Sequence, residues 1–177
     1  ISSLCGNGTV KSPTGDTAFM GPVTSINGEL ISTNRNYVYK LDFGPGGGAT
    51  VNGVVFDAAG TSGAGWSLSG SGWQNWGGDT GSGFGQMIYD FVFGSAIGTL
   101  TFSNLTVGKK YEAVLYAAPS WGTRVQNATF SNAASVVVMR DTASDFTGYY
   151  VYRFTAQSDK ASITMDAVDP TSKYHWY

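Results

Sequence analysis

Charged residues, cysteine and histidine are all scarce in this chain of 177 residues. The single cysteine, Cys5, cannot form an internal disulfide, and the presence of only one cysteine and one histidine disfavours a zinc site. Charged residues make up only 12% of the chain and the formal net charge is −2, so there is no basic stripe for nucleic-acid phosphates or for anionic lipid. No apolar run is long enough to span a bilayer. We therefore expect neither a nucleic-acid nor a membrane partner.

Aromatic residues and glycine are abundant instead: the chain has 5 tryptophans, 10 tyrosines, 10 phenylalanines and 25 glycines. The hydrophobic content of 42% fits a globular core, and the length favours one domain over residues 1–177. Few lysines beside many Gly, Ser, Thr and Asn residues favour a secreted, extracellular protein. Because the chain begins at Ile1 rather than Met, we expect a piece of a longer protein, a monomeric module linked to other domains.

Short alternating segments separated by turn residues predict an all-β fold. One segment, 85–93, fits either a short helix or an irregular crossover. About eight to ten antiparallel strands with little or no helix predict a β-sandwich. The predicted strands are residues 37–43, 50–56 with a bulge at Asn52-Gly53, 99–102, 111–118, 124–130, 134–139, 149–156 and 161–166, with a last strand beginning in 173–177.

The second half of the chain carries an ordered set of motifs. Residues 100–111, LTFSNLTVGKKY, contain a hairpin in which Gly108 is expected to take a positive φ, with Leu105 packed beneath Tyr111. The motifs SWGTR (120–124), YRFTA (152–156), ASITM (161–165) and HWY (175–177) follow. Together they resemble galactose-binding-like jelly-roll modules, which occur in large secreted bacterial proteins and beside polysaccharide-degrading enzymes.

This resemblance runs from Val51 to the end of the chain and implies a jelly-roll sandwich that binds a polysaccharide or oligosaccharide. Modules of this kind need no cofactor, although they often carry a structural calcium ion held by oxygen ligands. The chain has no Asp-x-Asp-x-Asp loop that would name such ligands.

The first candidate sugar site is the loop that contains Trp121 and Arg124. An exposed indole can stack on a pyranose ring, and a guanidinium can hold hydroxyls, a carboxylate or a sulfate. The alternative is that Trp121 caps the core and Arg124 pairs with a local acid such as Asp141.

The second candidate site lies in the glycine- and serine-rich stretch 60–85, which we expect to be a long functional loop. Aromatic rings for stacking and amides for hydrogen bonds to sugar hydroxyls occur together there, whereas the alternative is a loop that packs its own aromatics on a sheet. The candidate residues are Trp66, Trp73, Trp76, Gln74 and Asn75.

A catalytic site is not expected. The only histidine, His175, has no evident acid or nucleophile partner and is assigned a structural place, as is Trp176. A glycosidase needs two carboxylates roughly 5 to 10 Å apart, and 12 acidic residues supply such pairs by chance. The sequence therefore favours a non-catalytic carbohydrate-binding module, excised from a larger polysaccharide-active protein. The alternatives are a structural or adhesion module of a large secreted protein without a glycan site and, third, a small polysaccharide hydrolase or lyase.

Overall fold

The computed structural model describes residues 2–5, 9–12, 15–22, 28, 30–44, 47–70, 74–76, 83–89, 91–94, 97–117, 126–133, 135–140, 148–167 and 174–176. Strands dominate these residues, and the one helix among them, α1 (Phe84–Tyr89), is only six residues long. The predicted all-β sandwich is confirmed at the level of its class. The jelly-roll type stays a prediction.

The larger sheet has seven strands, and its inward and outward residues alternate in burial. In β14 every second residue from Gln126 to Asn132 is buried, and the same alternation runs through Ala161 to Met165 of β17. All neighbouring strands are antiparallel except the β1–β15 pair. The order across the sheet is β1 (Ser2–Cys5), β15 (Ser135–Arg140), β14 (Gln126–Asn132), β17 (Ala161–Ala167), β12 (Gly98–Phe102), β9 (Trp66–Ser69) and β8 (Ser62–Gly63).

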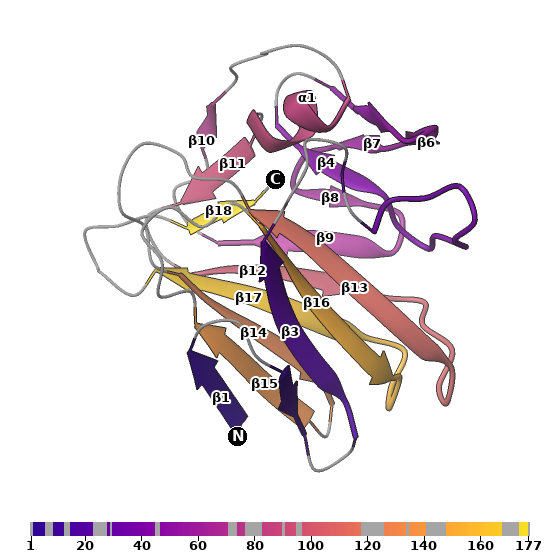
Figure 1. Cartoon of the computed structure of the whole chain (residues 1–177), viewed down its shortest axis with the longest axis vertical. Coiled ribbons are helices and arrows are strands. Elements are labelled where there is room, and N and C mark those ends of the chain that lie inside the picture. Colours follow the sequence, from indigo (N-terminus) through magenta and orange to yellow (C-terminus); the bar gives the residue numbers. More distant parts are fainter. Residues whose placement is uncertain are drawn as a thin grey trace.

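A second sheet of four strands faces the first (Figure 1). Its longest pair, β13 with β16, places Tyr111 beside Phe154 and Glu112 beside Arg153. Because neighbouring residues of a strand point to opposite faces, the first pair faces the core and the second the outside. The order is β13 (Lys110–Ala117), β16 (Gly148–Thr155), β3 (Thr17–Pro22) and β2 (Thr9–Lys11), so β13 is an edge strand within the described residues.

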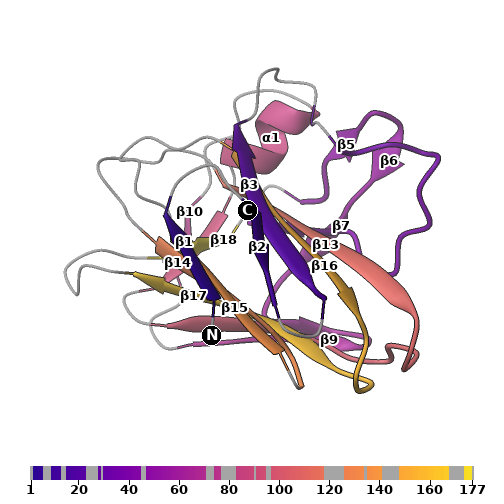
Figure 2. The ribbon, with the colours of Figure 1, turned by 60° about the horizontal axis from the view of Figure 1, so that its bottom comes forward.

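The main core lies between these two sheets, whose layered arrangement is visible in Figure 2. Phe130 of one sheet stacks on Tyr152 of the other with ring centroids 5.0 Å apart. Trp176 is completely buried in the same cluster, which confirms its predicted structural place. Phe43 reaches this core from β4 and lies against Trp66, 5.7 Å away and edge to face.

The remaining strands and α1 close one end of the sandwich (Figure 1). A second, smaller cluster of buried side chains lies there, and it joins α1 through Phe84 and Met87 to Tyr116 of β13. The strands are β4 (Leu41–Phe43), parallel to β7 (Asp57–Ala59), the hairpin of β5 (Thr50–Val51) and β6 (Val54–Val55), and the sheet of β10 (Gln74–Trp76), β11 (Phe91–Gly94) and β18 (Tyr174–Trp176).

A buried carboxylate connects the start of β3 to both sheets. Asp16, only 2% exposed, accepts hydrogen bonds from the Tyr152 hydroxyl (2.8 Å), the Asn132 amide (3.3 Å) and the Thr155 backbone N–H (3.3 Å). Several donors around one carboxylate offset the cost of burying its charge. This cluster fixes the N-terminal segment to the ends of β14 and β16.

The strands predicted in the second half of the chain are confirmed as β12 to β18, within two residues or so at their ends. The hairpin turn before β13 is also confirmed, since Gly108 has a φ of +82° and Leu105 is buried. The segment 85–93 contains the helix α1 and then β11, rather than a crossover without regular structure.

Three predictions need correction. Of the predicted strand 37–43, only Leu41–Phe43 is a strand, and residues 37–40 form a loop. Asn52-Gly53 is not a bulge but the two-residue turn of the β5–β6 hairpin, with φ of +50° and +77°, as expected for a type I′ turn. The stretch 60–85 is not one long loop, because β8, β9 and β10 lie in it.

Candidate functional site

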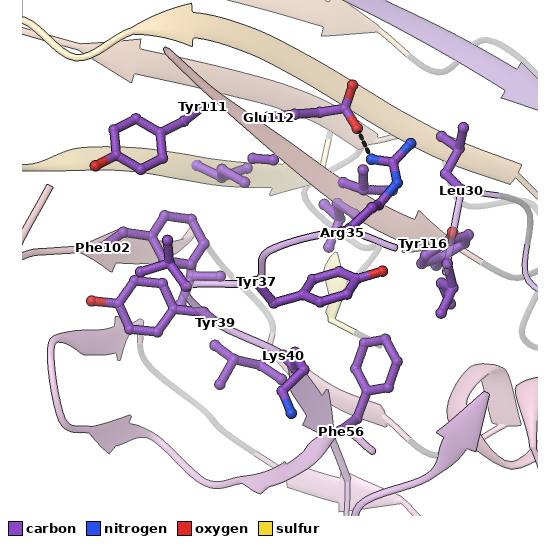
Figure 3. Close-up of a pocket in the computed structure, with 18 of the residues that line it drawn as sticks. Leu30, Arg35, Tyr37, Tyr39, Lys40, Phe56, Phe102, Tyr111, Glu112 and Tyr116 are labelled. Carbon is purple, nitrogen blue, oxygen red and sulfur yellow. Dashed lines mark hydrogen bonds and ion pairs between the residues drawn. The ribbon is translucent and has the colours of Figure 1, made fainter. Parts of the chain in front are cut away.

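A partly open cavity of about 490 Å³ lies along the free edge of β13. The loop 30–40 forms the opposite wall, and side chains of β12 and β17 reach it from the larger sheet. Figure 3 shows Tyr37 and Tyr39 on the loop side and Tyr111 and Glu112 on the β13 side. Its size and its mixture of apolar walls with a few polar groups are those of a small-molecule site.

Four tyrosines line this cavity, and the hydroxyls of Tyr37 and Tyr39 are hydrogen-bonded within the protein itself. The Tyr37 hydroxyl accepts from the Ser32 N–H and donates to the Ser32 carbonyl, both at 3.0 Å. The single proton of the Tyr39 hydroxyl is shared between the carbonyls of Gly65 (2.8 Å) and Ser103 (2.7 Å). Burial raises the pKa of Tyr39, and the bond to Ser103 only partly offsets it. The rings are therefore held in place and are left to interact through their faces.

The rings differ in how much of each face is already covered. Tyr39 stacks on Phe102 with centroids 5.4 Å apart, and Tyr111 stacks on Phe154 at 5.7 Å. The Lys109 ammonium lies 5.7 Å from the centre of the Tyr111 ring. Tyr37, by contrast, has no stacked or edge-on aromatic neighbour among the described residues. The half-buried Tyr37 ring packs against the smaller buried cluster but is not covered by a second stacked ring, which makes it a candidate platform for a ligand.

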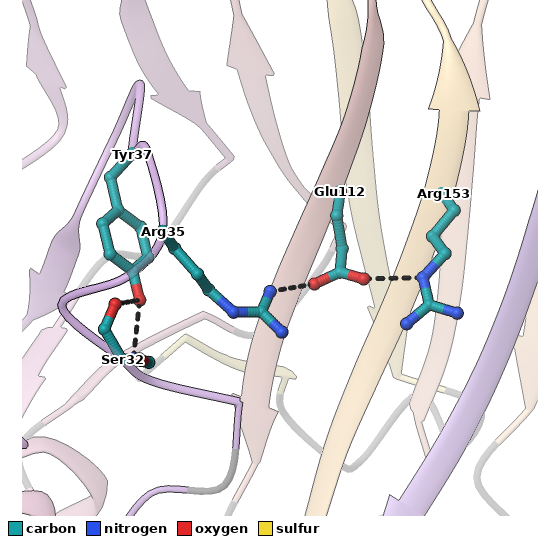
Figure 4. A network of polar contacts seen from close by, with 5 residues as sticks. All are labelled: Ser32, Arg35, Tyr37, Glu112 and Arg153. Atoms are coloured by element: carbon teal, nitrogen blue, oxygen red, sulfur yellow. Dashed lines mark hydrogen bonds and ion pairs between the residues drawn. The ribbon is translucent and has the colours of Figure 1, made fainter.

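An ion-pair network stiffens the wall of the cavity (Figure 4). Glu112 of β13 accepts from the guanidinium of Arg35 in the loop and from Arg153 Nε of β16, the latter at 2.6 Å. Burial raises the pKa of Glu112, but the bonds from Arg153 and Arg35 lower it by more, so its pKa lies below the ordinary value. Glu112 is therefore ionised at neutral pH and ties the loop to the edge strand.

Glu112 is the only carboxylate among the described residues that line the cavity. A two-carboxylate glycosidase needs a second acid whose pKa is raised so that it holds a proton. The described side chains that line the cavity do not supply such an acid pair.

Only part of the predicted site falls in the described residues. Trp66 is half-buried in β9, packs against the main core and lies over Gly63, and it does not line the cavity. The backbones of Gln74, Asn75 and Trp76 form β10, paired with β11. Trp73, Trp121, Arg124 and Asp141 lie outside the described residues, and so do the side chains of β10 and of His175.

The cavity residues Arg35, Tyr37, Tyr39, Tyr111 and Glu112 were not predicted as a site. Their sequence signal is weak, because the alternation of 37–43 imitates a strand and Glu112 is 77 residues from Arg35. The run Asn34-Arg35-Asn36-Tyr37, which combines polar groups with an aromatic ring, is the one local cue.

No group of three or more His, Cys, Asp or Glu side chains gathers as a metal site in the described part of the chain. The helix found there is too short to cross a membrane. Family models, curated proteins and solved structures were compared with this chain, and none matches.

Proposed function

We propose that this chain is a non-catalytic carbohydrate-binding module and that its sugar lies in the cavity against the ring of Tyr37. The observation that supports this most is the Tyr37 ring itself, which is fixed at its hydroxyl, packs on one side against the smaller buried cluster and has no stacked or edge-on aromatic partner within the described residues. A pyranose presents an apolar C–H face that suits such a ring. Because the ring is already in place, little conformational entropy is lost on binding.

Polar groups beside the ring supply partners for sugar hydroxyls. Arg35 and Asn36 precede Tyr37 in the loop, and Glu112 lies across from it on β13 (Figure 3). Glu112 accepts hydrogen bonds, and the guanidinium of Arg35 has donors beyond the one used for Glu112. The affinity is expected to be modest, because each sugar hydroxyl exchanges a bond to water for a bond to protein. Linked to an enzyme or a surface protein outside the cell, the module would raise the local concentration of its partner on a polysaccharide.

A second candidate function is the binding of an amphiphilic small molecule. The inner part of the cavity is lined by Leu100, Leu105 and Ile163. These side chains form no hydrogen bonds and would pack against the apolar tail of such a ligand. A ligand of that kind would bind through area buried in this inner part rather than through stacking on Tyr37.

The test is affinity electrophoresis through gels that contain neutral or acidic polysaccharides. The wild type should be retarded, Tyr37→Ala should lose about ten-fold in affinity, and Tyr37→Phe should keep most of it because the ring remains. Ile97→Ala, an exposed apolar side chain that does not line the cavity, is the matched control and should migrate as the wild type does.

Two further measurements distinguish this proposal from the alternative site and from the alternative ligand. Retardation that is lost in Trp121→Ala but kept in Tyr37→Ala would move the sugar site to the sequence-predicted loop. A protein that no polysaccharide retards, but that binds decanoate in calorimetry, would replace the glycan with an amphiphile. Failure of both measurements would favour the structural or adhesion module.

A further inference from the structure

Cationic side chains concentrate around the cavity. Among the described residues, four lysines and arginines line it, whereas only one carboxylate does. Arg35 and Lys40 come from the loop, and Lys109 and Lys110 come from the hairpin turn and the first residue of β13. A chain with a net charge of −2 has no general excess of cations, so this local excess needs its own explanation.

Among the described residues, the one carboxylate that lines the cavity already has two cationic partners. Glu112 binds both Arg35 and Arg153, and Arg153 itself does not line the cavity. Lys40, Lys109 and Lys110 have no carboxylate within ion-pair distance among the described residues. Figure 3 shows Lys40 on the far side of the Tyr37 and Tyr39 rings from Glu112, so the positive charge is not confined to one corner.

The walls between these cations are aromatic and aliphatic. Phe56, Phe102 and Leu41 are among them, and such walls lower the local dielectric and focus the field into the opening. The cavity is therefore complementary to a ligand with negative charge.

We infer that the ligand of the cavity is an acidic glycan, one that carries carboxylate groups as in a uronic acid or sulfate groups as in a sulfated sugar. This inference rests on the proposed function, because Tyr37 stacks on the sugar ring and the cations make the cavity selective for charged glycans. Arg35 keeps donors in the planar arrangement that matches a carboxylate or a sulfate. The lysines act as point charges around it.

The experiment uses polysaccharides that differ only in charge. Polygalacturonate is paired with its methyl ester, alginate with its methyl ester, and dextran sulfate with dextran, and binding is measured at low salt and in 0.5 M NaCl, a concentration at which exposed charges are screened within about 4–5 Å. At low salt, at least one acidic member should bind at least ten-fold more tightly than its neutral partner. High salt should remove most of that difference.

Single lysines are then replaced. Lys40→Gln and Lys110→Gln should each weaken binding of the acidic member by about two- to five-fold and leave the neutral member unchanged. Lys160→Gln is the matched control, because Lys160 is exposed and does not line the cavity. Lys109 is left intact, since it packs over Tyr111 and its replacement would also disturb that ring.

The outcomes distinguish this inference from the proposed function. Equal affinity for charged and neutral partners, with binding still lost in Tyr37→Ala, would overturn the acidic ligand and leave a carbohydrate-binding module. An equal loss in Lys160→Gln would show attraction to the whole surface rather than to the cavity and would also overturn it. Failure to bind any of the six polysaccharides would overturn both.

Discussion

The buried carboxylate of Asp16 should be the most destabilising single site to remove. In Asp16→Ala, the Tyr152 hydroxyl, the Asn132 amide and the Thr155 N–H all lose an acceptor, and these donors lie in or at the edge of the core. The Asn132 amide keeps its bond to the Thr155 carbonyl. Each buried donor that loses its partner costs about 1–3 kcal/mol, and relief of the buried charge offsets part of this. We expect a net loss of about 3–5 kcal/mol in the free energy of unfolding.

Urea unfolding followed by tryptophan fluorescence measures this loss. With a urea dependence of about 2 kcal/mol per M, the midpoint should fall by roughly 2 M. Tyr152→Phe removes one donor only and should cost about 1–2 kcal/mol, which keeps the test informative if Asp16→Ala does not fold. Asp159→Ala, at an exposed acid, should stay within about 0.5 kcal/mol of the wild type. A midpoint shift for Asp16→Ala no larger than that of Asp159→Ala would refute the reasoning.

Three further predictions concern the walls of the cavity. The pKa of Glu112 is lowered in the folded state, so its ion pairs stabilise the fold above the unfolded pKa of about 4.3, and this stability is lost as pH falls through the folded pKa. In urea titrations, Glu112→Gln should therefore cost about 1 kcal/mol at pH 7 and progressively less below about pH 4. Gly65→Ala should cost about 1–3 kcal/mol, because Gly65 has a φ of +81° and a Cβ would overlap the Tyr39 hydroxyl. Met87→Ala should lower stability by about 2–4 kcal/mol, because this side chain is 2% exposed beneath the loop.

Each of these has its own contrary result. A stability difference between wild type and Glu112→Gln that does not change with pH would remove the ion pairs from the account. Gly60→Ala, at a glycine with open space around it, is the control for Gly65→Ala, and equal effects would contradict the steric argument. An unchanged thermal midpoint in Met87→Ala would show that the smaller core cluster contributes little.

The sequence predicts the strands well where alternation reflects the two faces of a sheet. In β17 the buried positions follow the period of two, and β16 departs from it at Val151, which is buried between Tyr150 and Tyr152; both strands were predicted nearly to their ends. Residues 37–40 show the same alternation but form a loop. There the Tyr37 and Tyr39 hydroxyls bind backbone carbonyls of other loop residues. The N-terminal strands β1, β2 and β3 carried too little pattern to be predicted at all.

The candidate site was less predictable, because it depends on contacts between distant segments. The choice of a sugar ligand drew on tryptophans in glycine-rich stretches, and Trp66 turns out to pack on the core. Glu112 and Arg35 meet across 77 residues, and only the folded chain brings the loop 30–40 beside the free edge of β13. The cations also come from segments that only the fold brings together, so no local sequence motif predicts their cluster.

The ring of Tyr37 carries the central claim, and its aromatic ¹H–¹³C resonances report on it most directly. The protein would be titrated with an oligosaccharide cut from the polysaccharide that retards it most. We predict a saturable shift of the Tyr37 ring signals, with smaller shifts at Tyr39 and Tyr111 and none at Tyr152 in the core. Unchanged Tyr37 signals under conditions in which the oligosaccharide is bound would contradict the account and place the sugar elsewhere on the protein.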